Sequence, residues 1–346
     1  MSLPPSAPTS PLFEVRDTLN SGRGIFAIQN IPANTPLLKT DGPAASVILR
    51  EYRKEVCAQC FAYDSGREWK LRDNSTGFVF CIEACEAAWR SRQDATVAAE
   101  EAWQAIEKLS KGHSEEDIEL DDADAPKPVK PDIALAWKAV ERQASLIRAA
   151  RETSTSGDAP SKPARKAVRH ALAARPNPDV LAFLLSGILC KVSAPDAWEA
   201  VLALANNPRP YRSAADLAAH VAAYLQLLAV LPGPLLPHVT PDACITIPAR
   251  DSHNSFGIRS LEDDGSEFLG YGIWPVASYF NHSCAPNVEK RRVGRCWEFV
   301  AAREVRVGEE LCITYQSGED RQSRGQRRDA LKRNWGFECC CEKCME

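Results

Sequence analysis

The sequence predicts an α+β protein in which one β domain is interrupted by two insertions. Short apolar runs separated by turn residues fill residues 12–49 and return from about residue 235, as expected of short strands. Apolar residues at helical spacing occupy most of the chain in between. Many of the thirteen cysteines lie in two clusters, one after the first strands and one at the C-terminal end.

Composition narrows the class of protein. The chain has 346 residues, of which 25% are charged and 45% hydrophobic, as in ordinary globular domains. The net charge of −4 argues against direct nucleic-acid binding, which usually needs a basic surplus. We find neither a long apolar span nor the charged and apolar regions of a signal peptide, and we expect no membrane association. We therefore expect a monomer in the nucleus or cytoplasm.

The first strands are expected at residues 13–16 and 24–27, around the turn at residues 20–23. Pro32 and Pro36 break the segment that follows.

A long helical block follows the first cysteine cluster. Ser213 is expected to cap one helix, and Asp196 to lie in the first turn of another. Gly112 is expected to end the first helix. The predicted helices are residues 84–109, 133–151, 179–190, 195–206 and 213–231.

Two segments of this block read as flexible loops. Residues 153–166 are rich in Ser, Pro, Gly and Lys. Residues 115–124 are strongly acidic and precede several prolines. The acidic run is either a solvated loop or an attractant for a basic substrate such as a histone tail.

Strand texture returns at residues 245–247, 256–258 and 297–301. Beyond it, the basic stretch of residues 321–333 is interpreted as a solvated helix face.

The first cysteine cluster has the spacing of a zinc site. Cys57-x2-Cys60 and Cys81-x3-Cys85 are two chelating pairs that can close a four-thiolate tetrahedron. The alternative is coincidence in a cysteine-rich chain.

The second cluster offers three well-spaced thiolates, Cys339, Cys341 and Cys344, with Cys340 as the spare residue. A closed zinc site needs a fourth ligand, which spacing alone cannot identify. The alternative is a redox-active tail. The remaining single cysteines, Cys190, Cys244, Cys296 and Cys312, are expected to be small core residues.

Four segments in order resemble a SET domain: residues 21–27, Asn281-His282-Ser283-Cys284, residues 308–315, and residues 335–339 with the terminal cysteines. The cysteine module at 57–85 makes the chain similar to the SET–MYND protein-lysine methyltransferases. The resemblance covers nearly the whole chain and is weakest over residues 90–235. It implies a SET-domain β fold of short antiparallel sheets, interrupted by a zinc module and a helical insertion, with a C-terminal post-SET zinc site. The implied segments are 10–49 (SET, N-terminal part), 50–92 (reduced MYND-like zinc module), 93–239 (helical insertion), 240–320 (SET, C-terminal part) and 321–346 (post-SET).

The resemblance also implies the site. Tyr315 matches the tyrosine at the methyl-transfer centre. In the family the cysteine of the Asn-His-Ser-Cys motif completes the post-SET zinc site, which makes Cys284 the fourth ligand. The matched residues that contact S-adenosylmethionine are Ser21, Gly22, Arg23, Asn254, Asn281, His282, Tyr315 and Phe337.

The sequence departs from the family pattern in places. The second set of MYND ligands is missing, so we expect one zinc in this module and two in the chain. Trp335 stands where a channel tyrosine is common. The helical C-terminal domain of some members has no counterpart, so we expect a more open substrate groove.

The function expected from the resemblance is S-adenosylmethionine-dependent methylation of lysine on a histone or another protein. Tyr315 would position the reactants, since a phenol with an ordinary pKa near 10 is a poor base at neutral pH. One alternative is a zinc-stabilised interaction module with weak or no catalysis. Another is a transferase acting on a different protein residue.

Overall fold

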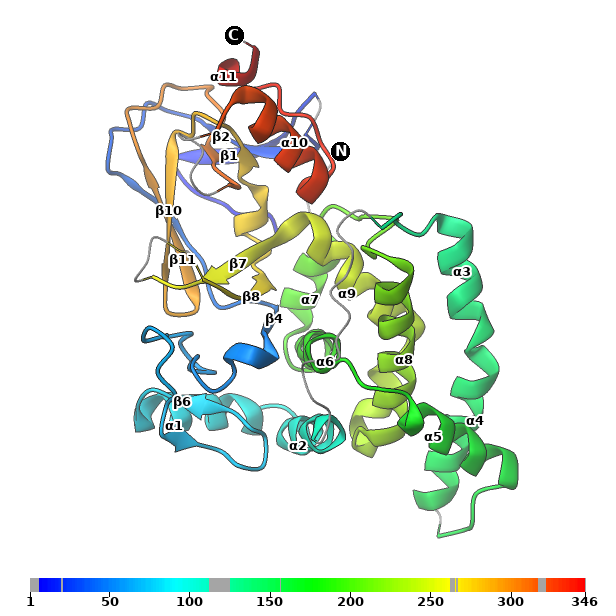
Figure 1. The fold of residues 1–346 in the computed structure, drawn as a ribbon. Helices are drawn as coiled ribbons and strands as arrows, with labels where there is room; N and C mark the ends of the chain where they lie inside the picture. Colours follow the sequence, from blue (N-terminus) through cyan, green and yellow to red (C-terminus); the bar gives the residue numbers. More distant parts are fainter. Residues whose placement is uncertain are drawn as a thin grey trace.

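The computed structural model describes residues 6–19, 21–111, 125–155, 157–261, 265, 267–316 and 322–345. Strands from the two ends of the chain gather at one end of the molecule, where both termini lie (Figure 1). The zinc module around β6 and α1 lies at the other end, and helices α3 to α9 form the flank. The segment boundaries stated above stay predictions.

Strands from both ends of the chain share sheets. The N-terminal ones are β1 (Phe13–Asp17), β2 (Arg23–Ala27), β3 (Pro36–Lys39) and β4 (Ala45–Ile48). The C-terminal ones are β7 (Ser255–Arg259), β8 (Phe268–Ile273), β10 (Val288–Val293) and β11 (Cys296–Ala301). The strand orders β10-β11-β3 and β4-β8-β7, all antiparallel, join the two groups, and β1 pairs with β2. The prediction of one interrupted β domain is confirmed.

One pairing differs from the antiparallel pattern. β9 (Asn281–His282) runs parallel to β12 (Cys312–Ile313), with Asn281 opposite Cys312. Parallel strands need a long connection, and here residues 283–311 supply it.

The predicted strand at residues 245–247 is wrong, because these residues lie inside α9 (Pro241–Asn254). Thr240 caps this helix by accepting a hydrogen bond from the Ala243 amide at 3.1 Å, and Pro241 occupies the first turn. A short apolar run cannot by itself distinguish a strand from a buried helix.

The helical block contains more breaks than the sequence predicted. The expected helix at 84–109 divides into α1 (Glu83–Asp94) and α2 (Ala99–Ser110), since Ala98 has a left-handed φ of 58°. The expected helix at 133–151 divides into α3 (Lys130–Ala139) and α4 (Glu141–Thr155). Gly112 and the acidic run lie outside the described residues.

Part of the predicted loop at 153–166 is helical. α5 (Lys162–Ala173) begins there because the Ser161 hydroxyl accepts from the Ala164 amide. The predicted helices at 179–190, 195–206 and 213–231 correspond to α6 (Pro178–Ser193), α7 (Pro195–Leu202) and α8 (Ala214–Val230), with the Ser213 cap confirmed. The smaller elements are η1 (Arg50–Tyr52), β5 (Leu71–Arg72), β6 (Val79–Phe80), η3 (Gly233–His238), η4 (Ala277–Tyr279), α10 (Arg324–Trp335) and α11 (Glu342–Met345).

Within the described part of the chain, no helix is long and apolar enough to cross a membrane.

The packing of α6 against α9 sets the position of α9, which ends at Asn254. Gly187 on α6 faces the buried Ile247 on α9, and a Cβ at Gly187 would lie 2.5 Å from the Ile247 Cδ1 atom. Such an approach is far inside van der Waals contact, so the two helices meet closely only because residue 187 has no side chain.

We predict that Gly187→Ala lowers the free energy of unfolding by about 1–3 kcal/mol, because overpacking outweighs the helix propensity of alanine. Ile247→Val removes the nearest methyl group and is expected to cancel part of this loss in the double variant. Urea unfolding of the two single variants and the double variant measures the coupling. Strictly additive effects would contradict this account of the contact.

Candidate active site and metal centres

Asn281 joins three segments that are far apart in the sequence. Its side-chain amide donates to the Glu310 Oε1 atom at 2.7 Å and to the Arg23 carbonyl at 3.2 Å. The backbone hydrogen bond from Leu311 to Ile25, at 2.7 Å, connects the same two partner segments directly. The N-terminal loop, the β9 strand and the Glu310 segment therefore form one unit.

Gly24 lies at the centre of this unit. A Cβ at this position would collide with the Glu310 carboxylate and would lie 2.8 Å from the Asn281 amide nitrogen. A side chain at this position would therefore displace the Glu310 carboxylate and the Asn281 amide from their present contact. Glu310, whose carboxylate orients Asn281, was not singled out from the sequence, although it stands in the segment that carries the family resemblance.

The Arg23 side chain extends away from this unit. Its guanidinium lies over the ring of Tyr279, 5.1 Å from the centroid, and donates to the Ala203 carbonyl at the end of α7. Ser21 and Gly22 are exposed, and Gly22 adopts a φ of 70° in a turn. The Gly22 carbonyl accepts a hydrogen bond from the Thr18 amide at 2.6 Å. The loop is thus held on one side by Thr18 and open on the other.

His282 and Tyr315 are linked by a hydrogen bond whose direction defines the histidine tautomer. The Tyr315 backbone amide donates to the His282 Nδ1 atom at 3.1 Å, so the ring proton of the neutral imidazole is on Nε2. Nε2 lies 3.3 Å from the Cys284 sulfur. Burial, together with the charges of Lys290 and Arg327, lowers the pKa of His282 to about 4, which keeps it neutral near pH 7.

The Tyr315 hydroxyl donates to the Phe280 carbonyl at 2.9 Å. Burial raises the pKa of Tyr315 above its ordinary value, so the group is a neutral phenol at physiological pH. Its ring lies 5.6 Å from Trp335 and 6.3 Å from Phe337, centroid to centroid. Phe337 is also 6.1 Å from the His282 ring, which makes one aromatic cluster from β9, the end of β12 and the C-terminal segment.

Asn254 is buried at the end of α9. Its side-chain amide donates to the carbonyls of Ala205, at 2.9 Å, and Arg250, at 2.6 Å. Its own carbonyl accepts from the Ser278 hydroxyl at 2.9 Å, three residues before Asn281. The amide thus holds local backbone, and Ser278 connects it to the segment that carries Asn281.

Four sulfurs meet at the C-terminal end, from Cys284, Cys339, Cys341 and Cys344, and all lie within 4.8 Å of one another. Cys284 is 3.5 Å from Cys344 and 3.9 Å from Cys339, close to the roughly 3.8 Å edge of a tetrahedral zinc–thiolate site. The fourth member, which spacing left open, is Cys284, and Cys340 is exposed as expected of the spare residue. This donor set fits a structural zinc ion.

Arg327 on α10 lies against this sulfur cluster. Its guanidinium donates to the Gln322 carbonyl at 2.9 Å and to the Lys343 carbonyl at 3.4 Å, and the nearby sulfurs of Cys284 and Cys344 raise its pKa. The side chain is buried, unlike its neighbours in the basic stretch predicted as a solvated helix face. A cation here offsets the negative charge that four zinc-bound thiolates carry. The sequence offered no signal for this role beyond the basic stretch itself.

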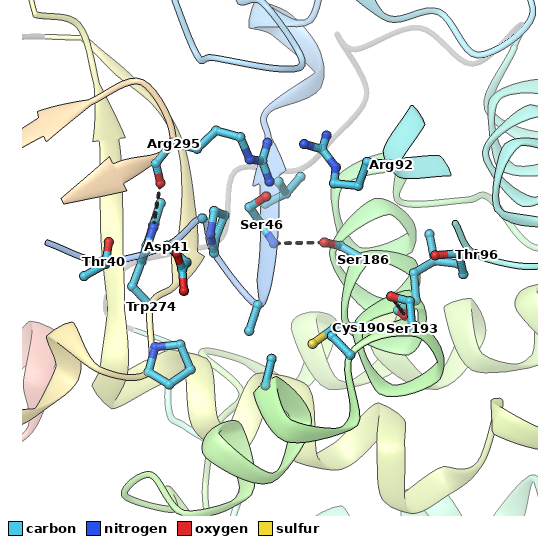
Figure 2. Close-up of a pocket in the computed structure, with 18 of the residues that line it drawn as sticks. Thr40, Asp41, Ser46, Arg92, Thr96, Ser186, Cys190, Ser193, Trp274 and Arg295 are labelled. Atoms are coloured by element: carbon cyan, nitrogen blue, oxygen red, sulfur yellow. Dashed lines mark hydrogen bonds between the residues drawn. The ribbon is translucent and has the colours of Figure 1, made fainter. Parts of the chain in front are cut away.

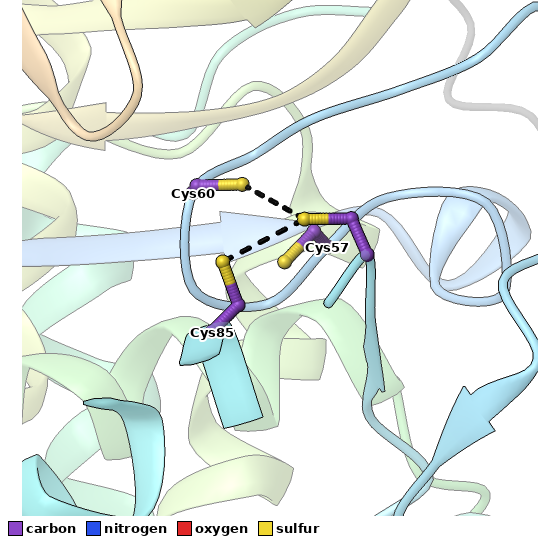
Figure 3. A group of neighbouring side chains, drawn as sticks. Cys57, Cys60 and Cys85 are labelled. Carbon is purple, nitrogen blue, oxygen red and sulfur yellow. Dashed lines mark hydrogen bonds between the residues drawn. The ribbon is translucent and has the colours of Figure 1, made fainter. Parts of the chain in front are cut away.

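The sulfur group of the zinc module consists of Cys57, Cys60, Cys81 and Cys85, again within 4.8 Å of one another. Figure 3 shows the sulfurs of Cys57, Cys60 and Cys85 turned toward a common point. Cys81 is 3.5 Å from Cys60 and 3.6 Å from Cys85. A hydrogen bond from Cys60 lowers the pKa of Cys57, which favours the thiolate form that zinc binds. This group also fits tetrahedral zinc.

Of the single cysteines, Cys190 and Cys244 are buried, as expected of core residues, whereas Cys296 and Cys312 are only partly buried.

The structure brings together most residues that the resemblance assigned to the site. Arg23, Asn281, His282, Tyr315 and Phe337 are connected by the contacts above. Residues that the sequence did not identify are Glu310, Tyr279, Phe280 and Arg327, whose roles depend on contacts between distant segments.

Comparison with known proteins identifies the family of the chain. Residues 22–316 match the sequence profile described as the SET domain. The chain is similar to "Potential protein lysine methyltransferase SET6" of Saccharomyces cerevisiae, with 26% identity over 97% of this chain and 95% of the yeast protein. It is 30% identical to "Histone-lysine N-methyltransferase ASHR2" of Arabidopsis thaliana, over 47% of this chain and 44% of that protein. A SET and MYND domain-containing protein of Dictyostelium discoideum is 36% identical over 26% of this chain and 21% of its own length.

We predict that native mass spectrometry finds two zinc ions per chain. Cys341→Ser is expected to leave one, because three thiolates no longer close the tetrahedron. The adjacent Cys340→Ser is the matched control and should keep both ions. One or three ions in the unmodified chain, or loss of an ion from the Cys340 variant, would contradict the ligand assignment.

Proposed function

This chain belongs to the SET domain family, and we propose that it is an S-adenosylmethionine-dependent protein-lysine N-methyltransferase. The observation that carries the proposal is the convergence of Gly24, Asn281 and Tyr315, from three distant segments, beside one aromatic cluster. The names of the relatives, which include lysine and histone-lysine methyltransferases, support this reaction class.

The residues present fit S-adenosylmethionine. Ser21 and Gly22 are exposed in the loop that precedes Gly24, and Asn281 is fixed beside this loop by two acceptors. We assign Ser21, Gly22 and Arg23 to one side of the cofactor and Phe337 to its adenine. We assign Asn254 the role of supporting the site, since its amide is engaged with backbone carbonyls.

When bound, the cofactor supplies a methyl group already activated by its sulfonium charge. The chain must therefore provide alignment and a neutral amine rather than acid catalysis. A lysine arrives protonated, with an ordinary pKa near 10.4. An apolar aromatic surrounding built from Tyr315 and Trp335 penalises the ammonium form and favours loss of its proton to water.

Tyr315 is proposed to position the reactants. Its raised pKa and its hydrogen bond to the Phe280 carbonyl leave it a fixed phenol rather than a base. Its orientation depends on both ends of the residue, because the backbone amide is held by His282 and the hydroxyl by Phe280. Alignment of this kind supplies a large share of the rate in favourable cases.

The second metal centre is proposed to support this alignment. A zinc ion there would hold Cys284, which faces the Nε2 proton of His282, while His282 Nδ1 holds Tyr315. Loss of this zinc should therefore impair activity without removing any residue that contacts substrate.

We propose that the substrate is a histone or another protein, a choice supported by the histone-lysine methyltransferase among the relatives. We also propose that the chain acts in the nucleus or cytoplasm. The competing proposal is an interaction module with weak catalysis. It is favoured by the four-cysteine zinc module and by Trp335, whose ring centroid lies 5.6 Å from that of Tyr315. Cofactor affinity separates the two proposals.

We predict that calorimetric titration of the zinc-loaded protein gives micromolar binding of S-adenosylmethionine. Asn281→Ala and Gly24→Ala should each abolish it, the first by removing the amide and the second by pushing Glu310 and Asn281 apart. Gly233→Ala is the control, since a Cβ at Gly233 meets nothing within 4 Å. Failure of the unmodified, folded protein to bind would favour the interaction module.

We predict that Tyr315→Phe reduces kcat by roughly 100-fold or more while the cofactor Kd stays within about threefold, because only alignment in the transition state is lost. Transfer of labelled methyl groups to a histone mixture measures the rate. Tyr52→Phe is the matched control, since that hydroxyl donates to Glu267 on the side of the zinc module. Equal loss in both variants would point to a general structural effect.

A further inference from the structure

A large cavity separates the zinc module from the SET core. It encloses about 1870 Å³ and is walled by β4, α6, α7, the zinc module and the segment around Trp274 (Figure 2). Tyr315 and Asn281 are not among the described residues that line it. The cavity is therefore separate from the proposed methyl-transfer site.

Two arginines face each other across one end of this cavity. Figure 2 shows the guanidinium groups of Arg92, on α1, and Arg295, on the turn between β10 and β11, directed toward one another. Arg92 donates to the Gln59 Oε1 atom at 2.6 Å. Arg295 lies over the Phe61 ring, 4.7 Å from its centroid, and donates to the carbonyls of Ala58 and Gln59 at 3.4 Å. Every one of these partners is neutral.

The other arginine of the cavity, Arg53, has counterions in Asp179 at 3.9 Å and Glu107 at 4.0 Å. Within the part of the chain that the structure describes, Arg92 and Arg295 form no ion pair with a carboxylate. The acidic residues that line the cavity are Asp41, Asp196 and Glu199.

The pair of like charges is costly as it stands. Burial, and then the charge of Arg92, lowers the pKa of Arg295 to about 9, so both groups remain protonated at neutral pH. Both side chains donate to the neutral groups named above, so within the described residues their guanidinium groups have no carboxylate acceptor.

We propose that this cavity binds an acidic peptide segment of another protein, with Glu or Asp carboxylates held between Arg92 and Arg295. Guanidinium groups bind carboxylates through two parallel hydrogen bonds. The volume exceeds that of typical small-molecule pockets, about 300–1,000 Å³, and suits a peptide rather than a single ion. Phe61, Trp103 and Leu189 supply apolar contact area beside the charges. The site does not depend on methyl transfer.

Fluorescence anisotropy with the zinc-loaded full chain tests this proposal. The probe is a fluorescein-labelled hexaglutamate peptide in a buffer of low ionic strength, beside a hexaglutamine peptide of the same length. The Arg92 side chain is exposed, so the Arg92→Gln variant should fold normally. The double variant Arg92→Gln/Arg295→Gln removes both charges. Arg165→Gln/Arg169→Gln, at two exposed positions on α5, is the matched control because it changes the net charge equally.

We expect hexaglutamate to bind, hexaglutamine not to bind, and binding to weaken at least about tenfold in the Arg92/Arg295 double variant, since both guanidinium groups that would hold the carboxylates are lost. The single Arg92 variant should be intermediate and the α5 control unchanged. Equal loss in the α5 control would overturn the proposal, because it would show only a net-charge effect. Equal or tighter binding of a labelled single-stranded oligonucleotide at the same arginines, or of a phosphoserine peptide without hexaglutamate binding, would also overturn it.

Discussion

The structure depends on the close contact of three chain segments, the N-terminal loop, strand β9 and the segment before β12. Gly24, Asn281 and Glu310 occupy this place, where the Asn281 amide is shared between a carboxylate and a backbone carbonyl. An unsatisfied amide or carboxylate there would cost more than the hydrogen bonds contribute, so the three residues specify one another. The parallel pairing of β9 with β12 follows from the same approach, since it brings Asn281 opposite Cys312, two residues after Glu310.

A chain of contacts extends from this place to the C-terminal metal centre. Cys284 follows Asn281 by three residues, and His282 between them bonds to the Cys284 sulfur on one ring nitrogen and to the Tyr315 amide on the other. The C-terminal segment brings both the remaining cysteines and Phe337, so one metal ion would hold the aromatic cluster and the tyrosine in register. Metal binding at this centre would therefore be coupled to the proposed chemistry through Cys284, His282 and Tyr315.

The two sulfur groups make different demands on their surroundings. The C-terminal group has a buried arginine, Arg327, against its thiolates. The sulfur group of the zinc module has Arg295 nearby, which stacks over the Phe61 ring. The Arg295 guanidinium points toward that of Arg92 in the cavity. In the first case the cation lies beside the sulfurs and its donors are taken up by two backbone carbonyls. In the second, part of the positive charge remains available, which is the basis for proposing an acidic partner there.

The sequence alone determined the cysteine pairs, the caps at Ser213, the strands at 13–16 and 24–27, and the interrupted β domain, because spacing, capping and turn chemistry act locally. It could not determine the helix at 245–247, the break at Ala98 or the start of α5, where local preferences are nearly balanced. Spacing alone left the fourth member of the second sulfur group open, and only the tertiary structure shows that it is Cys284. The contacts of Glu310 with Asn281 and of Arg92 with Arg295 are likewise visible only in the tertiary structure. Each of these contacts joins residues from 29 to more than 200 positions apart, and no local pattern encodes a pairing whose energy exists only after the chain has folded.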